Sequence, residues 1–180
     1  CWPYGKRIAV MVTFDFDAEF LRISRAESKG TSIGFTDFSR GQYGPHTGLL
    51  RFLNMLDAHQ VKSTFFVPGA VAEKYTEQVR MIHEQGHELA CHGYRHESVR
   101  GISREEEEAI LDKSEAALMA VTGKRPAGHR GPESIIHPFT HELLAERGYL
   151  YSSSMKDCDY AYLWEQDGKE LPLVELPNDI

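Results

Sequence analysis

The sequence has few cysteines and lacks the long apolar run of a membrane protein. Its 180 residues include three cysteines, Cys1, Cys91 and Cys158, and no C-x-x-C motif. A disulfide framework is therefore not expected, and a reducing, cytoplasmic compartment is favoured. No apolar stretch approaches the roughly 18 residues of a spanning helix, so no membrane span is predicted. No signal peptide is recognisable, but the chain begins at Cys1 rather than Met, so removal of the natural start stays an alternative.

Positive charge is not in excess. The formal net charge is -7, which argues against nucleic acid as a partner, because proteins that bind nucleic acid normally present a basic face. The acidic run Glu105–Glu108 predicts a solvated face at the start of a helix. A hydrophobic fraction of 41% with 26% charged residues is typical of a globular protein. The length suits a single domain or slightly more.

Apolar segments alternate with helical patterns along most of the chain. Strands are expected over residues 6–14, 61–67, 87–90, 126–130 and 149–152, and helices over 46–59, 70–85, 103–121 and 138–147. This alternation is typical of an α/β protein with parallel strands, arranged as an open sheet or a barrel. The first strand is expected to be buried on both faces. Functional side chains are expected just past the carboxyl ends of the strands.

Two further segments depart from this alternation. Residues 18–45 are rich in glycine, serine and charge, and they predict a long loop. Such a loop either caps a site or contacts another subunit of a homo-oligomer. Residues 160–164 and 171–176 flank the turn at 166–169 and predict a hairpin. Ser103 and Glu106 predict a capping box at the start of the longest helix.

Acidic and histidine side chains follow the first and third expected strands. Asp15 and Asp17 come directly after the first strand, where residues two apart in an extended chain point to the same side. Carboxylates this close repel each other unless a cation or a shared proton relieves them, although an aspartate-rich turn is the simpler alternative. His92 and His96 follow the third strand at the i, i+4 spacing that offers two imidazoles to one metal.

Two other histidine pairs have the same spacing. His83 and His87 are separated by Gly86, where a helix should end, so this pair is not expected to share a face. His137 and His141 straddle the start of a helix, where an exposed helix start is the favoured interpretation. The pair after the third strand is therefore the preferred pair of ligands.

Together these side chains suit a metal-dependent hydrolase. One carboxylate and two imidazoles leave one coordination position open for water on a zinc-like ion. A second carboxylate is then available as general base. Arg130 follows the fourth expected strand at the same end, where its guanidinium could hold that base by a forked hydrogen bond. One divalent ion is expected, with Zn preferred and Co, Fe or Ni as alternatives.

The motifs resemble those of a known family. Thr13–Glu19 (TFDFDAE), His92–His96 (HGYRH) and Arg130–Pro132 (RGP) resemble, in order and rough spacing, the first three motifs of the polysaccharide deacetylases. This is the NodB-homology group, also called carbohydrate esterase family 4, and the resemblance covers essentially the whole chain. The first motif, together with Ser39–Gly44 (SRGQYG), looks most like one subgroup. That subgroup holds intracellular peptidoglycan-deacetylase-like proteins and relatives acting on cyclic imides or other small amides.

The resemblance implies a fold and a set of roles. The fold would be a distorted (β/α) barrel with fewer than eight strands, and the activity would be metal-dependent amide hydrolysis. Carried onto this chain, Asp15 becomes the general base and Arg130 the residue that orients it. The metal ligands become Asp17, His92 and His96.

The resemblance also points to substrate-binding candidates and to two departures. The backbone N–H of Glu133 would contribute to an oxyanion hole, and Asp157 and Asp159 lie in the segment that lines the substrate cleft in the family. One departure is Ser134, where the family usually has glycine. The other is the lack of a histidine after Trp164, which in the family protonates the leaving amine. Residues 1–180 are therefore expected to be an incomplete deacetylase-like domain that ends before that histidine.

The functional expectation is an N-deacetylase of an N-acetylated carbohydrate such as peptidoglycan. A hydrolase of cyclic imides or other small amides is the alternative within the same chemistry. The alternative from another class is a non-catalytic, metal-stabilised binding domain, which the missing acid would favour.

Overall fold

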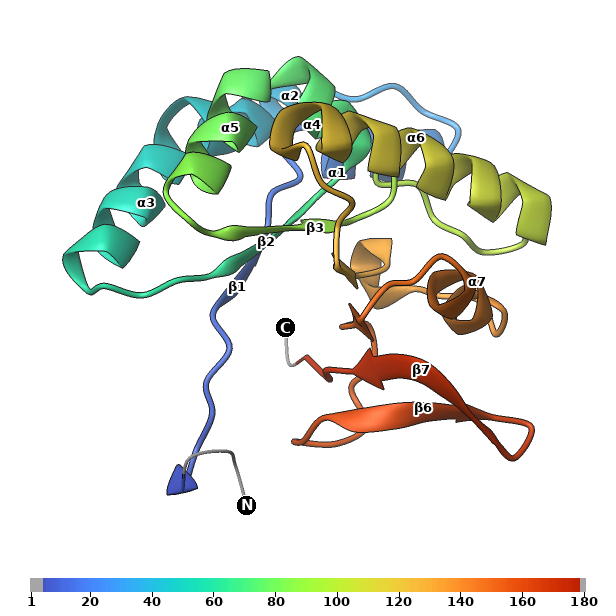
Figure 1. Cartoon of the computed structure of the whole chain (residues 1–180). Coiled ribbons are helices and arrows are strands. Elements are labelled where there is room, and N and C mark those ends of the chain that lie inside the picture. The colour runs from blue at the N-terminus through green and yellow to red at the C-terminus, as the bar shows by residue number, and fades with distance from the viewer. Residues whose placement is uncertain (1–4, 179–180) are drawn as a thin grey trace.

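A computed structural model describes residues 5–178, in which seven strands form one sheet (Figure 1). The strands are β1 (Thr13–Asp15), β2 (Thr64–Val67), β3 (Glu88–Cys91), β4 (Gly128–His129), β5 (Tyr151–Ser152), β6 (Tyr162–Gln166) and β7 (Lys169–Glu175). Their order in the sheet is β1-β2-β3-β4-β5-β7-β6. Neighbouring strands are parallel except for β6 and β7. The carboxyl ends of β1 to β5 and of β7 therefore meet at one edge of the sheet.

Helices connect the parallel strands, and most of them gather on one side of β2 and β3 (Figure 1). They are α1 (Phe20–Glu27), α2 (Phe35–Tyr43), α3 (Leu49–Ala58), α4 (Gly69–Lys74), α5 (Thr76–Glu84), α6 (Arg104–Thr122) and α7 (Thr140–Glu146), with a π-helical turn at Gly44–Gly48 and a 3-10 turn at Pro132–Ser134. The core between helices and sheet includes Leu53, Phe65, Val67, Ile82 and Leu118. Within residues 5–178, no helix is long and apolar enough to cross a membrane.

The predicted α/β architecture with fewer than eight strands is confirmed. The sheet has two end strands, β1 and β6, so it is open rather than a closed barrel. Its parallel part places the loops after β1, β3, β4 and β5 along one edge, which is the edge where functional side chains were expected.

Two local predictions are also confirmed. Ser103 accepts a hydrogen bond from the N–H of Glu106 at 3.2 Å, and the Glu106 carboxylate accepts one from the N–H of Ser103 at 2.7 Å. These bonds form the capping box of α6. The β6–β7 hairpin turns through Asp167 and Gly168, at φ 51° and 74°. Positive φ at both central residues is typical of a type I′ turn, which matches the twist of the strands.

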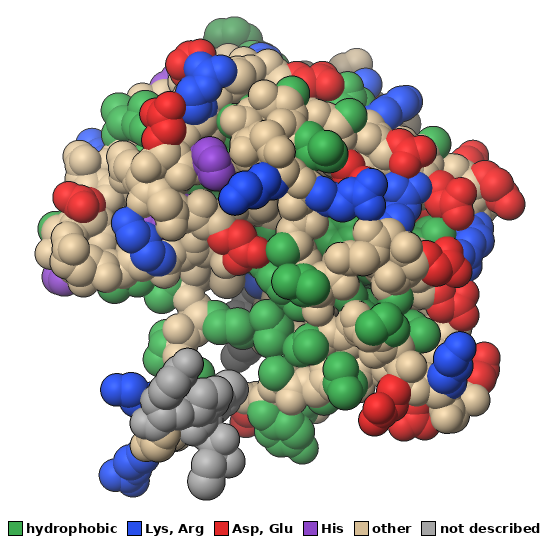
Figure 2. Space-filling view, viewed as in Figure 1, with side chains coloured by type: hydrophobic (Ala, Val, Ile, Leu, Met, Phe, Trp, Pro, Cys, Tyr) green, Lys and Arg blue, Asp and Glu red, His purple; other side chains and the backbone are tan. Residues whose placement is uncertain are grey.

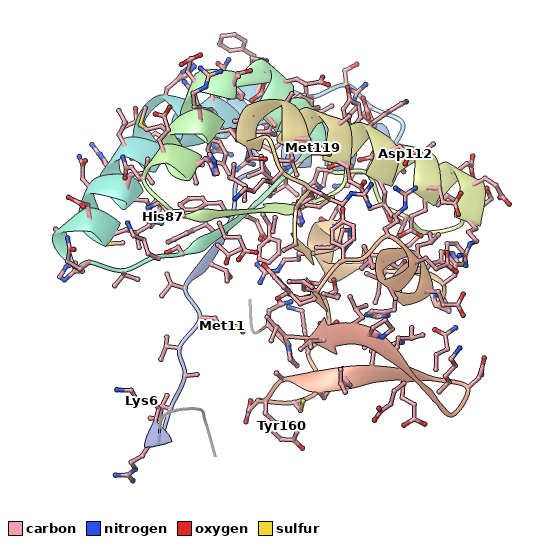
Figure 3. All side chains as sticks on the ribbon, in the orientation of Figure 1. Lys6, Met11, His87, Asp112, Met119 and Tyr160 are labelled. Atoms are coloured by element: carbon pink, nitrogen blue, oxygen red, sulfur yellow. The ribbon has the colours of Figure 1, made fainter. Side chains whose placement is uncertain are left out.

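The segment before β1 is exposed, and the prediction of a strand over 6–14 buried on both faces is wrong. Only Thr13–Asp15 pair with β2, and Ile8 and Val10 are 75% and 80% exposed. Lys6 and Met11 lie on a stretch that extends away from the rest of the molecule (Figure 3). The reason is topological, because β1 is an edge strand and has no second neighbour to bury the preceding residues.

Residues 18–45 form the helices α1 and α2, not the predicted loop. Glu19, just before α1, is fully buried and accepts hydrogen bonds from the Lys74 ammonium and, at 2.9 Å, from the Tyr75 hydroxyl. Gly41 of α2 packs so closely that a Cβ atom there would overlap the backbone of Glu19. These distant contacts stabilise the segment, and a local sequence pattern does not reveal them.

The helix predicted over 70–85 is two helices, α4 and α5. The break lies at Tyr75, whose φ of -116° and ψ of 44° are not helical. Its ring is buried and its hydroxyl bonds to Glu19, so the break directs this side chain toward the segment that follows β1.

Acidic side chains gather near the N-terminal end of α6 (Figure 2). Glu105 and Glu106 are exposed, as the predicted solvated face requires. Glu107 contradicts that prediction, because it is 2% exposed and accepts a hydrogen bond at 2.8 Å from the Thr140 hydroxyl. Its position on α6 faces the start of α7.

Candidate metal centre

Three predicted ligands converge at the carboxyl edge of the sheet. Asp17 lies two residues after β1, and His92 and His96 lie in the loop that follows β3. Their ligand atoms all lie within 4.8 Å of one another, and no other group of this kind occurs among residues 5–178. His92 Nε2 is 3.5 Å from Asp17 Oδ1, and His96 Nε2 is 3.6 Å from Asp17 Oδ2. Ligand atoms about 2.1 Å from a tetrahedral ion lie about 3.4 Å apart, so each of these two separations is compatible with a shared ion.

Two of the facing atoms of this triad have no hydrogen-bond partner. Asp17 Oδ1 and His92 Nε2 are both buried and unpaired, whereas buried polar atoms are nearly always paired. The other ring nitrogen of His92, Nδ1, lies 2.7 Å from the carbonyl oxygen of Arg130. If that nitrogen carries the proton, Nε2 presents its lone pair to the triad. The three side chains therefore fit a cation.

Burial shifts the pKa of each triad member in the direction that favours its neutral form. Burial, together with the negative charge of Asp15, raises the pKa of Asp17 to about 8. Burial lowers the pKa of His92 to about 4, and it also lowers the pKa of His96. Both imidazoles are then neutral at pH 7, which is the form that ligates metals. A bound cation would favour the ionised form of Asp17 and offset its raised pKa.

Asp15 lies beside the triad and is held by Arg130, but through one hydrogen bond rather than the predicted fork. Arg130 follows β4, and its Nη1 donates a hydrogen bond to Asp15 Oδ1 at 2.8 Å. The other carboxylate oxygen, Oδ2, is 4.0 Å from His92 Nε2. One oxygen of Asp15 is thus fixed by the guanidinium while the other faces the triad.

Arg130 is itself held on all sides. It is 2% exposed, and its guanidinium stacks 3.9 Å from the centre of the Phe66 ring. Its Nε donates to the carbonyl of Ser153 at 3.0 Å, and its Nη2 donates to the Ser153 hydroxyl at 2.9 Å and to the Thr13 hydroxyl at 3.2 Å. These contacts leave the guanidinium a single orientation, toward Asp15.

Helix α1 is tied to the loops around the triad by two ion pairs. Arg25 Nε donates to Glu133 Oε1 at 2.5 Å, and Arg95 Nη2 donates to Glu27 Oε1 at 3.2 Å. Glu133 follows β4, and Arg95 precedes the triad member His96. One helix therefore bridges the loops that follow β3 and β4.

The loop that carries Glu133 has an uncommon backbone. Glu133 and Ser134 have φ of 55° and 56°, in the left-handed region that glycine adopts most easily. The departure at Ser134 therefore falls where the conformation itself favours glycine. The role predicted for the Glu133 N–H in an oxyanion hole stays a prediction.

The structure does not bring the remaining substrate-binding candidates into contact with the triad. Asp157 accepts a hydrogen bond from the Tyr162 hydroxyl at 3.0 Å, and both Asp157 and Asp159 are exposed. Across residues 5–178, no hydrogen bond or ion pair links either of them to Asp17, His92 or His96. Their roles stay predictions.

The other histidine pairs occupy separate places. His83 ends α5, whereas His87 lies beyond Gly86 and accepts a hydrogen bond from the backbone of Ser63 at 3.2 Å. The exposed helix start favoured for His137 and His141 is wrong for His141, which is buried. It lies 3.2 Å from Glu175 and is covered by the Trp164 ring.

Several residues around the triad were not predicted from the sequence. Ser153 directly follows β5 and Thr13 lies in β1, so their positions at the strand ends were a usable signal. Arg25 gave no such signal, because its segment was predicted to be a loop. Glu175 gave none either, because only the parallel pairing of β7 with β5 brings it to this edge.

A family model described as polysaccharide deacetylase matches residues 38–152. The match covers more than half of the chain and includes His92, His96 and Arg130, but it begins after Asp15 and Asp17. The chain belongs to the polysaccharide deacetylase family, as its motifs predict.

Curated relatives show the same similarity, and one of them matches nearly the whole chain. The peptidoglycan deacetylase-like protein FGM2 of Gibberella zeae is 31% identical over 172 residues, which cover 94% of this chain and 50% of the relative. The peptidoglycan deacetylase of Helicobacter pylori is 35% identical over 124 residues, which cover 69% of this chain and 42% of the relative. The chain thus spans about half the length of these relatives.

Solved structures show the same fold. A Mycobacterium smegmatis structure assigned to the polysaccharide deacetylases is 40% identical, with a TM-score of 0.89 over 99% of this chain and 61% of that one. The structure of Puue allantoinase has a TM-score of 0.84 at 22% identity, covering 99% of this chain and 64% of that one. At that identity the likeness shows the fold alone.

Proposed function

We propose that this chain is a metal-dependent hydrolase of amide C–N bonds that deacetylates an N-acetylated carbohydrate such as peptidoglycan. One observation carries the proposal, namely a triad with unpaired ligand atoms beside a carboxylate that a buried arginine holds in place. The family supports it as well, since the relative from Helicobacter pylori is named a peptidoglycan deacetylase.

Asp17, His92 and His96 would hold the ion, with Zn preferred and Co, Fe or Ni as alternatives. When bound, this ion supplies a Lewis acid for an amide carbonyl and for water. The pKa values of both imidazoles lie below the ordinary value, so protons would not compete with the ion for either ring nitrogen at pH 7. The carbonyl oxygen of Arg130 orients the His92 ring through its contact with Nδ1 of His92.

Asp15 is the proposed general base. Its Oδ1 is held by Arg130 Nη1, so Oδ2 is the oxygen that would take a proton from the attacking water. The guanidinium fixes the direction of this carboxylate. The Glu133 N–H would stabilise the negative charge that forms on the carbonyl oxygen.

A hydrolase of cyclic imides or other small amides is the second candidate. The observation in its favour is the bridge that α1 makes to the loops around the triad through Arg25 and Glu27. Such a bridge restricts access for a polymer more than for a small molecule. Rates on N-acetylglucosamine oligomers and on small cyclic imides would separate the two, and faster turnover of the imides would favour this candidate.

The experiment that tests the proposal is Asp15→Asn in the metal-loaded protein. It should keep the ion and lower kcat/KM by roughly a hundredfold or more, because the proton acceptor is lost. Asp57→Asn, at an exposed position of α3, is the matched control and should keep full turnover. Undiminished turnover in Asp15→Asn would contradict the proposal. A protein that binds metal but hydrolyses neither substrate class would favour a non-catalytic binding domain.

A further inference from the structure

We infer that Glu175, at the end of β7, is a positioning residue. It keeps the Arg130–Asp15 pair correctly oriented by fixing the loop after β5. The inference rests on the proposed role of Asp15 as general base. It assigns a task to a buried carboxylate that the proposed chemistry does not use.

Glu175 is fully buried, and each of its own two carboxylate oxygens contacts polar groups. Its Oε1 accepts hydrogen bonds from the N–H of Ser154 at 2.7 Å and from the N–H of Met155 at 2.9 Å. Its Oε2 lies 3.2 Å from Nε2 of His141, whose ring stacks on Trp164 with centroids 3.6 Å apart. One oxygen of Glu175 therefore accepts hydrogen bonds from two successive backbone amides of the loop after β5.

The charge of Glu175 is preserved despite its burial. Burial alone would raise the pKa of Glu175, but the hydrogen bonds from His141 and from the backbone of Met155 and Ser154 together lower it. No lysine or arginine of residues 5–178 forms an ion pair with it. A buried carboxylate is costly unless it is fully hydrogen-bonded, and simple filling of this space would be served as well by an apolar side chain.

The same loop holds Arg130 from its other side. The Ser153 carbonyl and hydroxyl accept from Arg130 Nε and Nη2, and the Ser154 hydroxyl accepts from the N–H of Gly131 at 3.0 Å. The loop thus turns its amide N–H groups toward Glu175 and its acceptors toward Arg130.

A continuous set of contacts therefore runs from Glu175 to the proposed base. Glu175 fixes the amides of residues 154 and 155, Ser153 fixes the guanidinium of Arg130, and Arg130 fixes Asp15 Oδ1. Without the carboxylate, the buried N–H of Ser154 and the partly buried N–H of Met155 would lose their acceptor, and the loop would rearrange to find another. A small shift of Ser153 would then move Arg130 and the Asp15 carboxylate.

The first test reads Arg130 directly and needs no turnover. In the parent protein the Nε–H of Arg130, which is buried and bonded to Ser153, should give a slowly exchanging 15N-NMR signal, identified as the signal lost in Arg130→Lys. Glu175→Leu should lose this protection. Glu175→Gln keeps an oxygen where Oε1 stands and should largely restore it.

The matched control is Glu107→Leu, which removes another buried carboxylate that bonds to Thr140 rather than to the loop after β5. It should lower stability and leave the Arg130 signal unchanged. If Glu175→Leu does not fold, Glu175→Asp, which withdraws the carboxylate by one methylene, takes its place. An Arg130 signal that stays protected in Glu175→Leu, or in Glu175→Asp where that variant replaces it, would overturn the inference. So would a signal lost equally in Glu107→Leu.

Kinetics give the second test. Glu175→Leu should lower kcat by roughly tenfold to a hundredfold at unchanged KM and metal content, because the base is misplaced while the ligands remain. Glu175→Gln should recover most of that loss, whereas a fall in kcat no larger than in Glu107→Leu would contradict the inference. If the parent turns over no amide, the proposed function fails, but the NMR comparison still decides whether Glu175 positions Arg130.

Discussion

At the residue scale, two aspartates only two positions apart have opposite environments. Asp15 is paired with Arg130, and its side chain is 26% exposed. Asp17 is 13% exposed, its Oδ1 is unpaired, and two imidazole nitrogens lie 3.5 and 3.6 Å from its carboxylate. The first environment suits a fixed proton acceptor and the second suits a cation ligand. The difference arises from the side chains on the loops after β3 and β4, not from the aspartates themselves.

The raised pKa of Asp17 predicts how the stability of the metal-free protein changes with pH. Its folded-state pKa of about 8 exceeds the unfolded value of 3.8, so its contribution to stability is full below pH 3.8 and is lost as pH rises through 8. The contribution of His92 has the opposite sign and is complete above pH 6.5. Between pH 6.5 and 8 the free energy of unfolding should therefore fall by up to about 2 kcal/mol.

Urea unfolding in the presence of a chelator measures this fall. Asp17→Asn should show a flatter dependence between pH 6.5 and 8, whereas Asp57→Asn should behave as the parent. An equally steep fall in Asp17→Asn would mean that other groups cause it.

The site residues that the sequence predicts lie at the end of a strand or shortly after it. Asp15, Asp17, His92 and Arg130 were located because parallel strands bring their carboxyl ends to one edge. Glu175 also ends a strand, but the sequence does not single it out, because it predicts the β6–β7 hairpin without showing that β7 lies beside β5. The limit was long-range pairing rather than residue chemistry.

At the element scale, elements that depend on adjacent residues are predicted better than elements that depend on distant contacts. The capping box of α6 and the turn between β6 and β7 depend on a few adjacent residues, and both were predicted correctly. The extent of β1 and the helices at 18–45 were predicted wrongly. The first depends on the position of β1 at the edge of the sheet, and the second depends on Glu19 meeting Lys74 and Tyr75 of a later segment.

Gly41→Ala tests the packing of α2 against Glu19. The added Cβ would overlap the Glu19 backbone, so the variant should lose about 1–3 kcal/mol of stability. Gly44→Ala is the matched control, because a Cβ there meets only the edge of the Phe16 ring at 3.8 Å. Thermal unfolding of the two variants gives the comparison, and equal melting temperatures would show that α2 does not pack as described.

At the scale of the whole molecule, the candidate site depends on the complete parallel part of the sheet. The Arg130–Asp15 bond joins residues 115 positions apart, and the triad joins the loops after β1 and β3. Neither group can form before these strands pair. An ion that binds only the folded chain would therefore stabilise the whole sheet, by an amount that grows with the logarithm of its concentration relative to its Kd.

The central claim is that Asp17, His92 and His96 bind one catalytic metal ion, and metal analysis of purified variants tests it most directly. The parent and Asp57→Ala should each carry about one divalent ion per chain, and Asp17→Ala should carry almost none, because three protein ligands are what such a site requires. Amide hydrolysis should be lost with the ion in Asp17→Ala. In the parent, a chelator should abolish hydrolysis and added Zn²⁺ should restore it. A metal content in Asp17→Ala equal to that of the parent would contradict the account.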